Sequence, residues 1–293
     1  MSMYRLRLKI APYLFISPFF ILFACFMLYP FMFSIYTSFT EWSGIAPPQF
    51  NHLDNYAKLF RDSIFKQSII NGLVIYVMYV PIMVLLALLL AVGLTRPWVK
   101  LKSLFRAALF IPNITSVVAV AFLFQYVFSS SETGIINSMI RSMGFDVQIS
   151  WFGSALNARI VVSILILWRW LGYNMILMMA GLSNIDDELF EAAEIDGAGA
   201  ISKFVKITIP LMRHSILFSC VMSTMGTFSM FVEPRILTRG GGPMNSTIST
   251  VLYMYNTAFE YMKMGYASAI AVAYFIIIMV ITLLQFQVNK QSN

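Results

Sequence analysis

The residues that point most directly to a function lie in a short acidic stretch that is rich in alanine. It comprises Glu191, Ala192, Ala193, Glu194, Ile195, Asp196, Gly197 and Ala198. The pattern predicts a helix over about 187–196, because acidic residues in the first turn interact favourably with the helix dipole. Ser183 or Asp186 is expected to cap this helix.

A bend is expected directly after the predicted helix. Gly197 and Gly199 allow the chain to turn where a side chain would collide. A second short helix is expected over about 201–206, and Pro210 should start or bend the approach to the next apolar segment. Small residues at a sharp bend suit a surface that another protein grips. Composition alone also fits a solvated loop with one helical turn.

Arg169 is a charged residue inside an otherwise apolar segment. A charge at mid-depth in a membrane costs at least about 2.5–3.5 kcal/mol, so its guanidinium should face protein or water. Asn174 lies little more than one helical turn away. Two interpretations stay open. Arg169 either donates hydrogen bonds to hydroxyls along a solute path, or pairs structurally with a backbone carbonyl or with Glu233.

Small hydroxylated residues recur at four-residue spacing in a later apolar segment, which places them on one helix face. They are Ser215, Ser219, Ser223 and Thr227. Such a face either packs closely against another helix or lines a cavity. Aromatic rings and an acid further along the segment would suit the C–H surface and hydroxyls of a sugar. The candidate substrate path is Arg169, Asn174, Ser223, Thr227, Phe228, Phe231 and Glu233.

Several other chemistries lack the residues that they require. His52 and His214 are far apart and have no Cys or carboxylate companions at ligand spacing, so no metal site is expected. The chain contains no Gly-x-x-x-x-Gly-Lys-Ser/Thr sequence and therefore should not bind ATP through a P-loop. It also contains no nucleophile elbow. We expect no catalytic residue and no cofactor in this chain.

Composition defines the setting of these residues. The chain is 59% hydrophobic and only 11% charged, against roughly 25% charged in an ordinary soluble domain. We therefore expect an all-α, polytopic membrane protein with a single transmembrane domain over 1–293 and a connecting loop over 182–213. A spanning helix needs about 20 mostly apolar residues. Six segments qualify, at about 12–39, 69–94, 107–129, 160–181, 214–236 and 266–287.

Basic residues give the expected orientation, because short cytoplasmic loops are enriched in Lys and Arg. They are Arg5, Arg7 and Lys9 before the first span, and Arg96, Lys100, Lys102 and Arg106 in the next short connection. Both termini and the loop 182–213 are therefore expected on the cytoplasmic side. The net charge of +7 reflects these clusters and does not indicate a nucleic-acid partner. The first apolar run is too long for a signal peptide.

Two external segments also carry recognisable patterns. One predicts an amphipathic helix at the outer membrane surface, from apolar residues at helical spacing: Leu53, Tyr56, Ala57, Phe60 and Ile64. The other predicts a tight turn, from Gly240, Gly241, Gly242 and Pro243.

The acidic stretch and the residues that follow it resemble the EAA motif of the permease subunits of type I ATP-binding-cassette importers. The residues that carry this resemblance are Glu191, Ala192, Ala193, Asp196, Gly197, Ala198, Phe204, Ile207 and Pro210. The family often has proline where this chain has Asp186 and His214. Other positions resemble its carbohydrate-transporting, maltose-permease-like branch. These are Asn55, Tyr56, Asn71, Thr238, Gly241, Gly242, Pro243 and the run Gly265-Tyr266-Ala267-Ser268-Ala269.

The resemblance implies a six-helix permease in a prokaryotic cytoplasmic membrane. It implies a second permease subunit, which is often a different chain, and a pair of ATPase subunits that hold ATP and Mg. It also implies an extracytoplasmic binding protein that delivers a carbohydrate. In the family, the acidic loop docks onto the ATPase.

Two alternatives stay open. The first is a permease of the same type for a polyol or a glycerol phosphodiester. The second is an ion-coupled secondary transporter, which would need intramembrane acids. The predicted spans contain no such acid except Glu233, near an edge.

Overall fold

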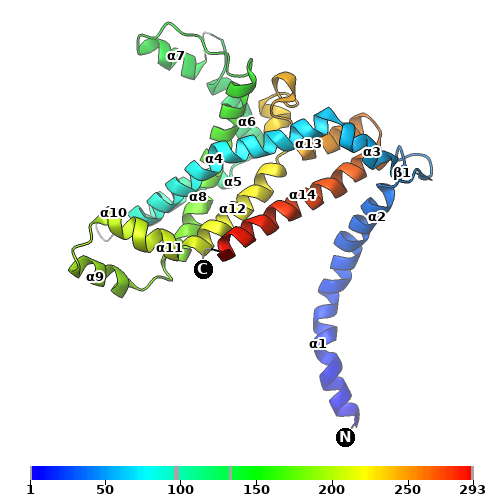
Figure 1. Ribbon diagram of the computed structural model, residues 1–293, viewed down its shortest axis with the longest axis horizontal. Coiled ribbons are helices and arrows are strands. Elements are labelled where there is room, and N and C mark those ends of the chain that lie inside the picture. Colours follow the sequence, from blue (N-terminus) through cyan, green and yellow to red (C-terminus); the bar gives the residue numbers. More distant parts are fainter. Residues whose placement is uncertain (1, 96–98, 132–133, 292–293) are drawn as a thin grey trace. The chain divides into compact units, whose positions relative to one another are not determined.

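The computed structural model describes residues 2–95, 99–131 and 134–291 (Figure 1), with side chains described from residue 13 to residue 289 outside those gaps. Arg96 and the side chains of Arg5, Arg7 and Lys9 lie outside this described part. The prediction of an all-α protein is confirmed. Among the described residues the only strands are β1 (Thr40–Glu41) and β2 (Gln49–Phe50), which form an antiparallel ribbon.

The helices are grouped in two compact units, Met1–Asp62 with Met254–Phe275, and Ser63–Tyr253 with Ile276–Asn293. The first unit contains α1 (Ser2–Phe23), the π turn η1 (Ala24–Leu28), α2 (Tyr29–Thr37), α3 (Asp54–Arg61) and η5 (Asn256–Glu260). The second contains α4 (Ser63–Thr95), α5 (Lys102–Ile114), α6 (Val117–Val127), α7 (Ile135–Ser142), α8 (Ala155–Leu182), α9 (Asp187–Ile195), α10 (Ala200–Lys203), η2 (Phe204–Thr208), α11 (Ile209–Leu211), α12 (Arg213–Phe228), η3 (Glu233–Leu237) and η4 (Pro243–Asn245). Residues of α13 (Thr250–Tyr255) and α14 (Met264–Gln291) belong to both.

Four helical segments of the described chain are long and apolar enough to cross a membrane unbroken: Tyr13–Thr37, Ser63–Thr95, Ala155–Leu182 and Met264–Asn289. Two further candidates are bent pairs, α5 with α6 at 94° and the α10–α11 segment with α12 at 67°. The first bend occurs because Thr115 and Ser116 take extended backbone angles. The Thr115 hydroxyl then donates 2.8 Å to the Ile111 carbonyl, which satisfies part of the helix end.

The predicted amphipathic helix is present in the first unit as α3, but it is shorter than expected. Leu53 is its N-cap residue, and Ile64 lies beyond its end, in α4. The inward side of α3 is formed by Asn55 and Leu59, whereas Leu53 and Phe60 are 62% and 77% exposed. The Asn55 amide donates 2.9 Å to the carbonyl oxygens of Ser38 and of Thr40, which ties α3 to the end of α2. Contact of the exposed stripe with a membrane surface stays a prediction.

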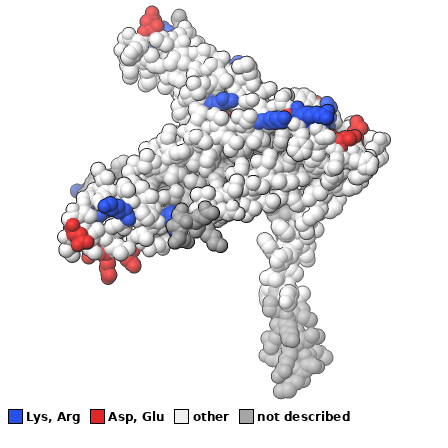
Figure 2. Space-filling view, viewed as in Figure 1, with Lys and Arg blue, Asp and Glu red and all other residues white. Residues whose placement is uncertain are grey.

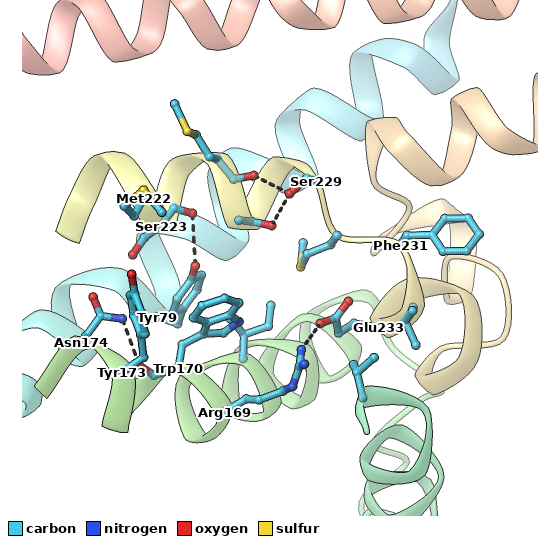
Figure 3. Close-up of a pocket in the computed structure, with 16 residues that line it drawn as sticks. Tyr79, Arg169, Trp170, Tyr173, Asn174, Met222, Ser223, Ser229, Phe231 and Glu233 are labelled. Carbon is cyan, nitrogen blue, oxygen red and sulfur yellow. Dashed lines mark hydrogen bonds and ion pairs between the residues drawn. The ribbon is translucent and has the colours of Figure 1, made fainter. Parts of the chain in front are cut away.

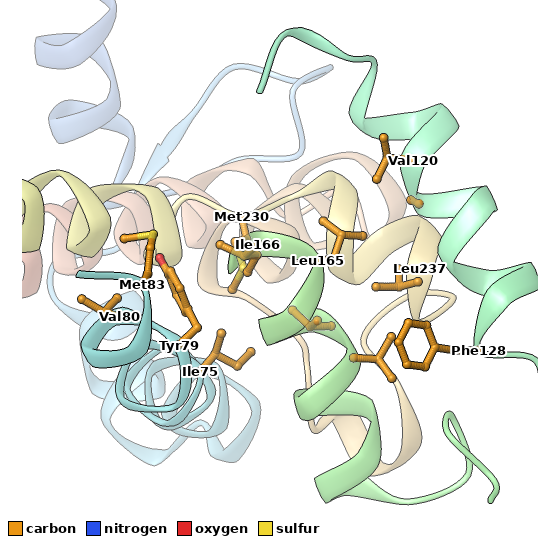
Figure 4. Packing of buried hydrophobic residues seen from close by; sticks show 13 residues of the cluster. Ile75, Tyr79, Val80, Met83, Val120, Phe128, Leu165, Ile166, Met230 and Leu237 are labelled. Carbon is orange, nitrogen blue, oxygen red and sulfur yellow. The ribbon is translucent and has the colours of Figure 1, made fainter. Parts of the chain in front are cut away.

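The second unit is built on extensive contact between α4 and α8. Side chains from both helices form its largest buried cluster, together with residues of α6 and η3 (Figure 4). Helix α5 also packs on α8, at Gly172, where any Cβ would overlap the Leu109 carbonyl oxygen. Helix α12 lies against α4, where the hydroxyls of Tyr79 and Thr227 are 2.7 Å apart. This packing positions the two candidate sites below.

Candidate functional site

The predicted acidic helix is present as α9 (Asp187–Ile195). Asp186 occupies the N-cap position with extended backbone angles, although its side chain makes no capping hydrogen bond. Asp187 and Glu188 lie in the first turn, where a carboxylate is stabilised by the helix dipole. Acidic side chains gather on the molecular surface around α9 (Figure 2).

Gly197 ends α9 in a turn that requires the left-handed backbone conformation. Its φ is +78°. The Gly197 amide donates 3.0 Å to the Glu194 carbonyl, and the Ala198 amide donates 2.8 Å to the Ala193 carbonyl. These two bonds define a Schellman motif with Gly197 at its centre. The glycine is therefore required by backbone geometry.

The expectation that Gly199 has the same role is wrong. Its φ is −68° and its ψ is 167°, which any residue can adopt. The expected collision is also absent within the described chain, because a Cβ at Gly197 or Gly199 would meet no atom within 4 Å.

The chain after the bend is more continuous than predicted. Instead of ending near residue 206, α10 runs into the π turn η2 and then into α11. The Lys203 ammonium lies 3.0 Å from a Glu194 carboxylate oxygen, which joins α10 to α9. Phe204 packs against a buried cluster from α4 and α8 that includes Leu94 and Met178. We call the segment 187–203 the α9–α10 turn, and the packing of Phe204 directly after it anchors the turn to α4 and α8.

The other side of the α9–α10 turn is open. Glu191, Ala192, Asp196 and Gly197 are exposed, and Ala193 and Ala198 are half-buried. Beyond the bend, Ile207 is half-buried and Pro210 is exposed. Two exposed apolar side chains beside the bend were not among the predicted site residues, Ile195 at 87% exposure and Ile201 at 81%. Their apolar character next to a glycine bend was the signal available in the sequence. Burial of such exposed apolar side chains against a partner would be energetically favourable.

The predicted substrate-path residues converge on a pocket of about 380 Å³ between α8, α12 and the segment that follows α12 (Figure 3). Five of them line it, namely Arg169, Asn174, Ser223, Phe231 and Glu233. Sequence reasoning missed Tyr79 of α4, which joins Trp170 and Tyr173 as an aromatic lining. The packing of α4 against α8 brings Tyr79 here, and the sequence carries no signal for that contact.

The two remaining candidates lie outside the pocket lining. Thr227 is 0% exposed and its hydroxyl donates 2.6 Å to the Ser223 carbonyl. Phe228 packs over Gly72 of α4, where a Cβ would come within 2.7 Å of its ring. Both residues hold α12 against α4, so the packing interpretation of the hydroxylated face applies to this part of it.

Asn174 and Phe231 line the pocket with their polar or aromatic groups already engaged. The Asn174 amide donates 3.0 Å to the Trp170 carbonyl and accepts 2.5 Å from the Ser219 hydroxyl. The Phe231 ring points away from the labelled pocket side chains (Figure 3) and lies 5.6 Å from the Arg235 guanidinium carbon. Both groups are therefore less available to a solute than the other side chains that line the pocket.

Arg169 and Glu233 face one another across the pocket (Figure 3), with 3.6 Å between Nη1 and Oε1. Their side chains are 17% and 10% exposed. A direct charged hydrogen bond is about 2.7–2.9 Å long, so this pair is loose. Arg169 Nε is buried and has no hydrogen-bond partner among the described residues. Arg169 thus pairs with Glu233 and also lines a cavity, and its contact with a solute stays a prediction.

The arrangement fits binding better than catalysis. It combines aromatic walls, a hydroxyl from Ser223 and one loosely paired charge couple, a mixture typical of small-molecule sites. Within the described residues there is no group of three His, Cys, Asp or Glu that could hold a metal.

Comparisons with known proteins agree with a transport role. Residues 56–291 match the family described as binding-protein-dependent transport system inner membrane component. The chain is 36% identical to the lactose transport system permease protein LacF of Rhizobium radiobacter, over 96% of this chain and 94% of LacF. It is 34% identical to the arabinooligosaccharides transport system permease protein AraP of Bacillus subtilis, over 96% and 89%.

Solved structures show the same fold. A chain of a bacterial ABC transporter involved in the import of the acidic polysaccharide alginate superimposes with a TM-score of 0.83 at 21% identity, over 99% of both chains. A chain of a bacterial alginate ABC transporter, in complex with an alginate pentasaccharide-bound periplasmic protein, gives 0.78 at 22%, over 96% of both. The protein therefore belongs to the family of binding-protein-dependent transport system inner membrane components, and it is a permease with the ABC importer fold.

Proposed function

We propose that this chain is the permease subunit of an ATP-driven importer that carries a carbohydrate across the cytoplasmic membrane. The observation that carries the proposal is the pocket, in which the rings of Tyr79, Trp170 and Tyr173 lie beside the Arg169–Glu233 pair. Aromatic faces can cover the C–H surface of a sugar, and the charged pair can exchange hydrogen bonds with its hydroxyls. The names of the lactose and arabinooligosaccharide relatives support the same solute class.

The complete importer would contain several partners. An extracytoplasmic binding protein would deliver the solute, a second permease would complete the pathway, and two ATPase subunits would bind ATP and Mg. The α9–α10 turn would dock on one ATPase, with Ile195 and Ile201 covered at that contact. In this arrangement both termini and the loop 182–213 would lie on the cytoplasmic side, as the Lys and Arg distribution predicts.

ATP binding must favour one of two packed states of the assembly if it is to move solute. Closure of the ATPase pair would push on the α9–α10 turn. The turn would act as a lever because the Lys203–Glu194 pair joins its two helices, and Phe204, directly after it, packs against the cluster from α4 and α8. The pocket would open outward in one state and inward in the other.

Uptake by proteoliposomes that contain the whole complex and its binding protein tests this function. We expect ATP-dependent uptake of a neutral disaccharide or pentose oligosaccharide. Polyols and glycerol phosphodiesters should compete poorly. ATP-dependent uptake of only the phosphodiester would overturn the carbohydrate assignment. Uptake driven by an ion gradient without the ATPase would overturn the whole proposal.

A further inference from the structure

Two arginines of α8 hold one and the same segment of the chain. Arg159 and Arg169 are ten residues apart in sequence, which corresponds to about 15 Å along a helix. Both contact residues 229–249, which we call the wall segment because its first residues line the pocket. The two contacts differ in how completely their hydrogen bonds are satisfied.

The contact at Arg159 centres on the side-chain amide of Asn71, which is 1% exposed and uses all its hydrogen-bonding positions, although the neighbouring Ser246 hydroxyl is buried without a partner among the described residues. Asn71 Nδ2 donates 2.6 Å to the Asn245 carbonyl and 3.0 Å to the Ile248 carbonyl. Asn71 Oδ1 accepts 2.9 Å from Arg159 Nη2 and 2.9 Å from Gln67 Nε2. An amide side chain has two donor and two acceptor positions, and all four are used here.

Arg159 also holds the wall segment directly, because its Nε donates 2.9 Å to the Ser246 carbonyl. Asn71 and Arg159 together therefore bind three nearby carbonyls of the wall segment to α4 and α8. We call this group the amide node. Its loop needs such support, since the non-glycine residues Met244 and Asn245 have positive φ angles of 51° and 57°, which L-residues disfavour.

A chain of hydrogen bonds leads from the amide node to the pocket. The Thr247 amide donates 2.8 Å to the Gly241 carbonyl, and the Gly241 amide donates 3.0 Å to the Pro234 carbonyl, next to Glu233. At the C-terminal end of the wall segment, the Ser249 hydroxyl donates to the Met230 carbonyl. Displacement at the node would therefore reach the residues that line the pocket.

We propose that Asn71 and Arg159 are positioning residues for the solute pocket. They fix the far end of the wall segment, so that Glu233 stays opposite Arg169 and the segment can move only at its pocket end. The Arg169–Glu233 contact is the exchangeable one, because its charges are 3.6 Å apart and Arg169 Nε lacks a partner among the described residues. The inference concerns geometry and does not depend on which solute is carried.

The reactivity of a thiol placed in the pocket tests this assignment without any solute. Val232→Cys puts the thiol on the wall segment, in a background where both native cysteines, Cys25 and Cys220, are replaced by serine. Labelling by a water-soluble maleimide is timed in the whole purified complex in nanodiscs. Arg159→Ala and Asn71→Asp should each speed labelling about tenfold, as loss of buried hydrogen bonds eases local opening.

Matched variants separate positioning from general damage. Arg159→Lys, which restores one donor, should give an intermediate rate, and Arg141→Ala, at an exposed arginine of α7, should leave the rate unchanged. If the stronger variants fail to assemble, Gln67→Met removes a single bond to Asn71 and should speed labelling about threefold. Unchanged labelling in assembled complexes of the node variants would overturn the proposal. Equal acceleration by Arg141→Ala would overturn it too.

Discussion

The α9–α10 turn and the pocket use glycine and charge in opposite ways. Gly197 in the turn has open space around it and is needed for its φ of +78°. Gly172 of α8, behind the pocket, is needed for a different reason, because the backbone of α5 lies too close to it to leave room for a side chain. The Lys203–Glu194 pair of the turn has a carboxylate that is 76% exposed, whereas neither side chain of the Arg169–Glu233 pair exceeds 17%. Backbone geometry is enough to shape the turn, while the pocket depends on contacts between distant helices.

This difference fits a division of labour. A docking surface must keep its conformation without the partner and leave apolar side chains accessible, as Ile195 and Ile201 are in the α9–α10 turn. A pocket that alternates between two states must instead be held by contacts that can exchange.

The largest effect is expected from Gly172→Leu, which attacks the helix packing behind the pocket. The added side chain overlaps the backbone of α5 at Leu109, and overpacking of this kind costs about 3 kcal/mol. The yield of intact complex after detergent extraction and its melting temperature should both fall. Gly93→Leu in α4 is the matched control, because a Cβ there meets no atom within 4 Å. Equal losses in both variants would contradict close packing as the cause.

A slightly smaller effect is expected from Glu233→Ala. It leaves the Arg169 guanidinium largely enclosed without its partner. Breaking a buried ion pair in this way lowers the free energy of unfolding by about 3 kcal/mol. Adding Arg169→Ala should recover most of the melting temperature, because no uncompensated charge remains. Uptake by the double variant should stay low.

The double variant decides between the two interpretations of Arg169. Recovery of stability together with full uptake would make the pair purely structural. Recovery of stability without uptake would assign it to the solute path. Because the coupling between two charges is measured as the difference between single and double variants, a complete cycle is needed.

Gly197→Asp moves the perturbation to the α9–α10 turn, and its global effect should be smaller. An L-residue at this φ costs about 1 kcal/mol, which should lower the docked fraction of ATPase roughly fivefold. The protein should still insert, and its melting temperature should hardly change. ATPase copurification and ATP-driven uptake are the measurements.

Gly199→Asp supplies the control for that experiment, because it adds the same charge two residues away at an ordinary φ of −68°. We expect near-normal uptake from it. If both variants lose uptake equally, the partner surface rather than the backbone turn sets the requirement for glycine at these positions.

The same contrast explains what the sequence could predict. Helix α9 and the bend at Gly197 follow from local rules for dipoles and helix ends, so they were predictable. Arg169 and Glu233 were also predictable, since an intramembrane charge requires a partner. The role expected of Gly199 was wrong because composition does not reveal φ. Tyr79 in the pocket was not predictable, because it depends on which helices become neighbours.

The amide node shows the same limit more clearly. Asn71 drew attention only through its resemblance to a family position, and nothing local indicates that its amide reaches the carbonyls of Asn245 and Ile248. Those carbonyls are brought to it by a loop with several positive φ angles. Long-range polar contacts of this kind become visible only when the packing of α4 and α8 is known.

The smallest effect is expected from Lys203→Met, which removes the ion pair that joins α10 to α9. Because Glu194 is 76% exposed, solvent screens the pair, and such pairs contribute about 0–1 kcal/mol. Uptake should fall less than about twofold at physiological salt, and the deficit should grow at low salt, where screening is weaker. Lys206→Met, at an exposed lysine of η2, controls for loss of charge. A tenfold loss from Lys203→Met alone would mean that a partner encloses this pair, and that the turn depends on long-range contacts as the pocket does.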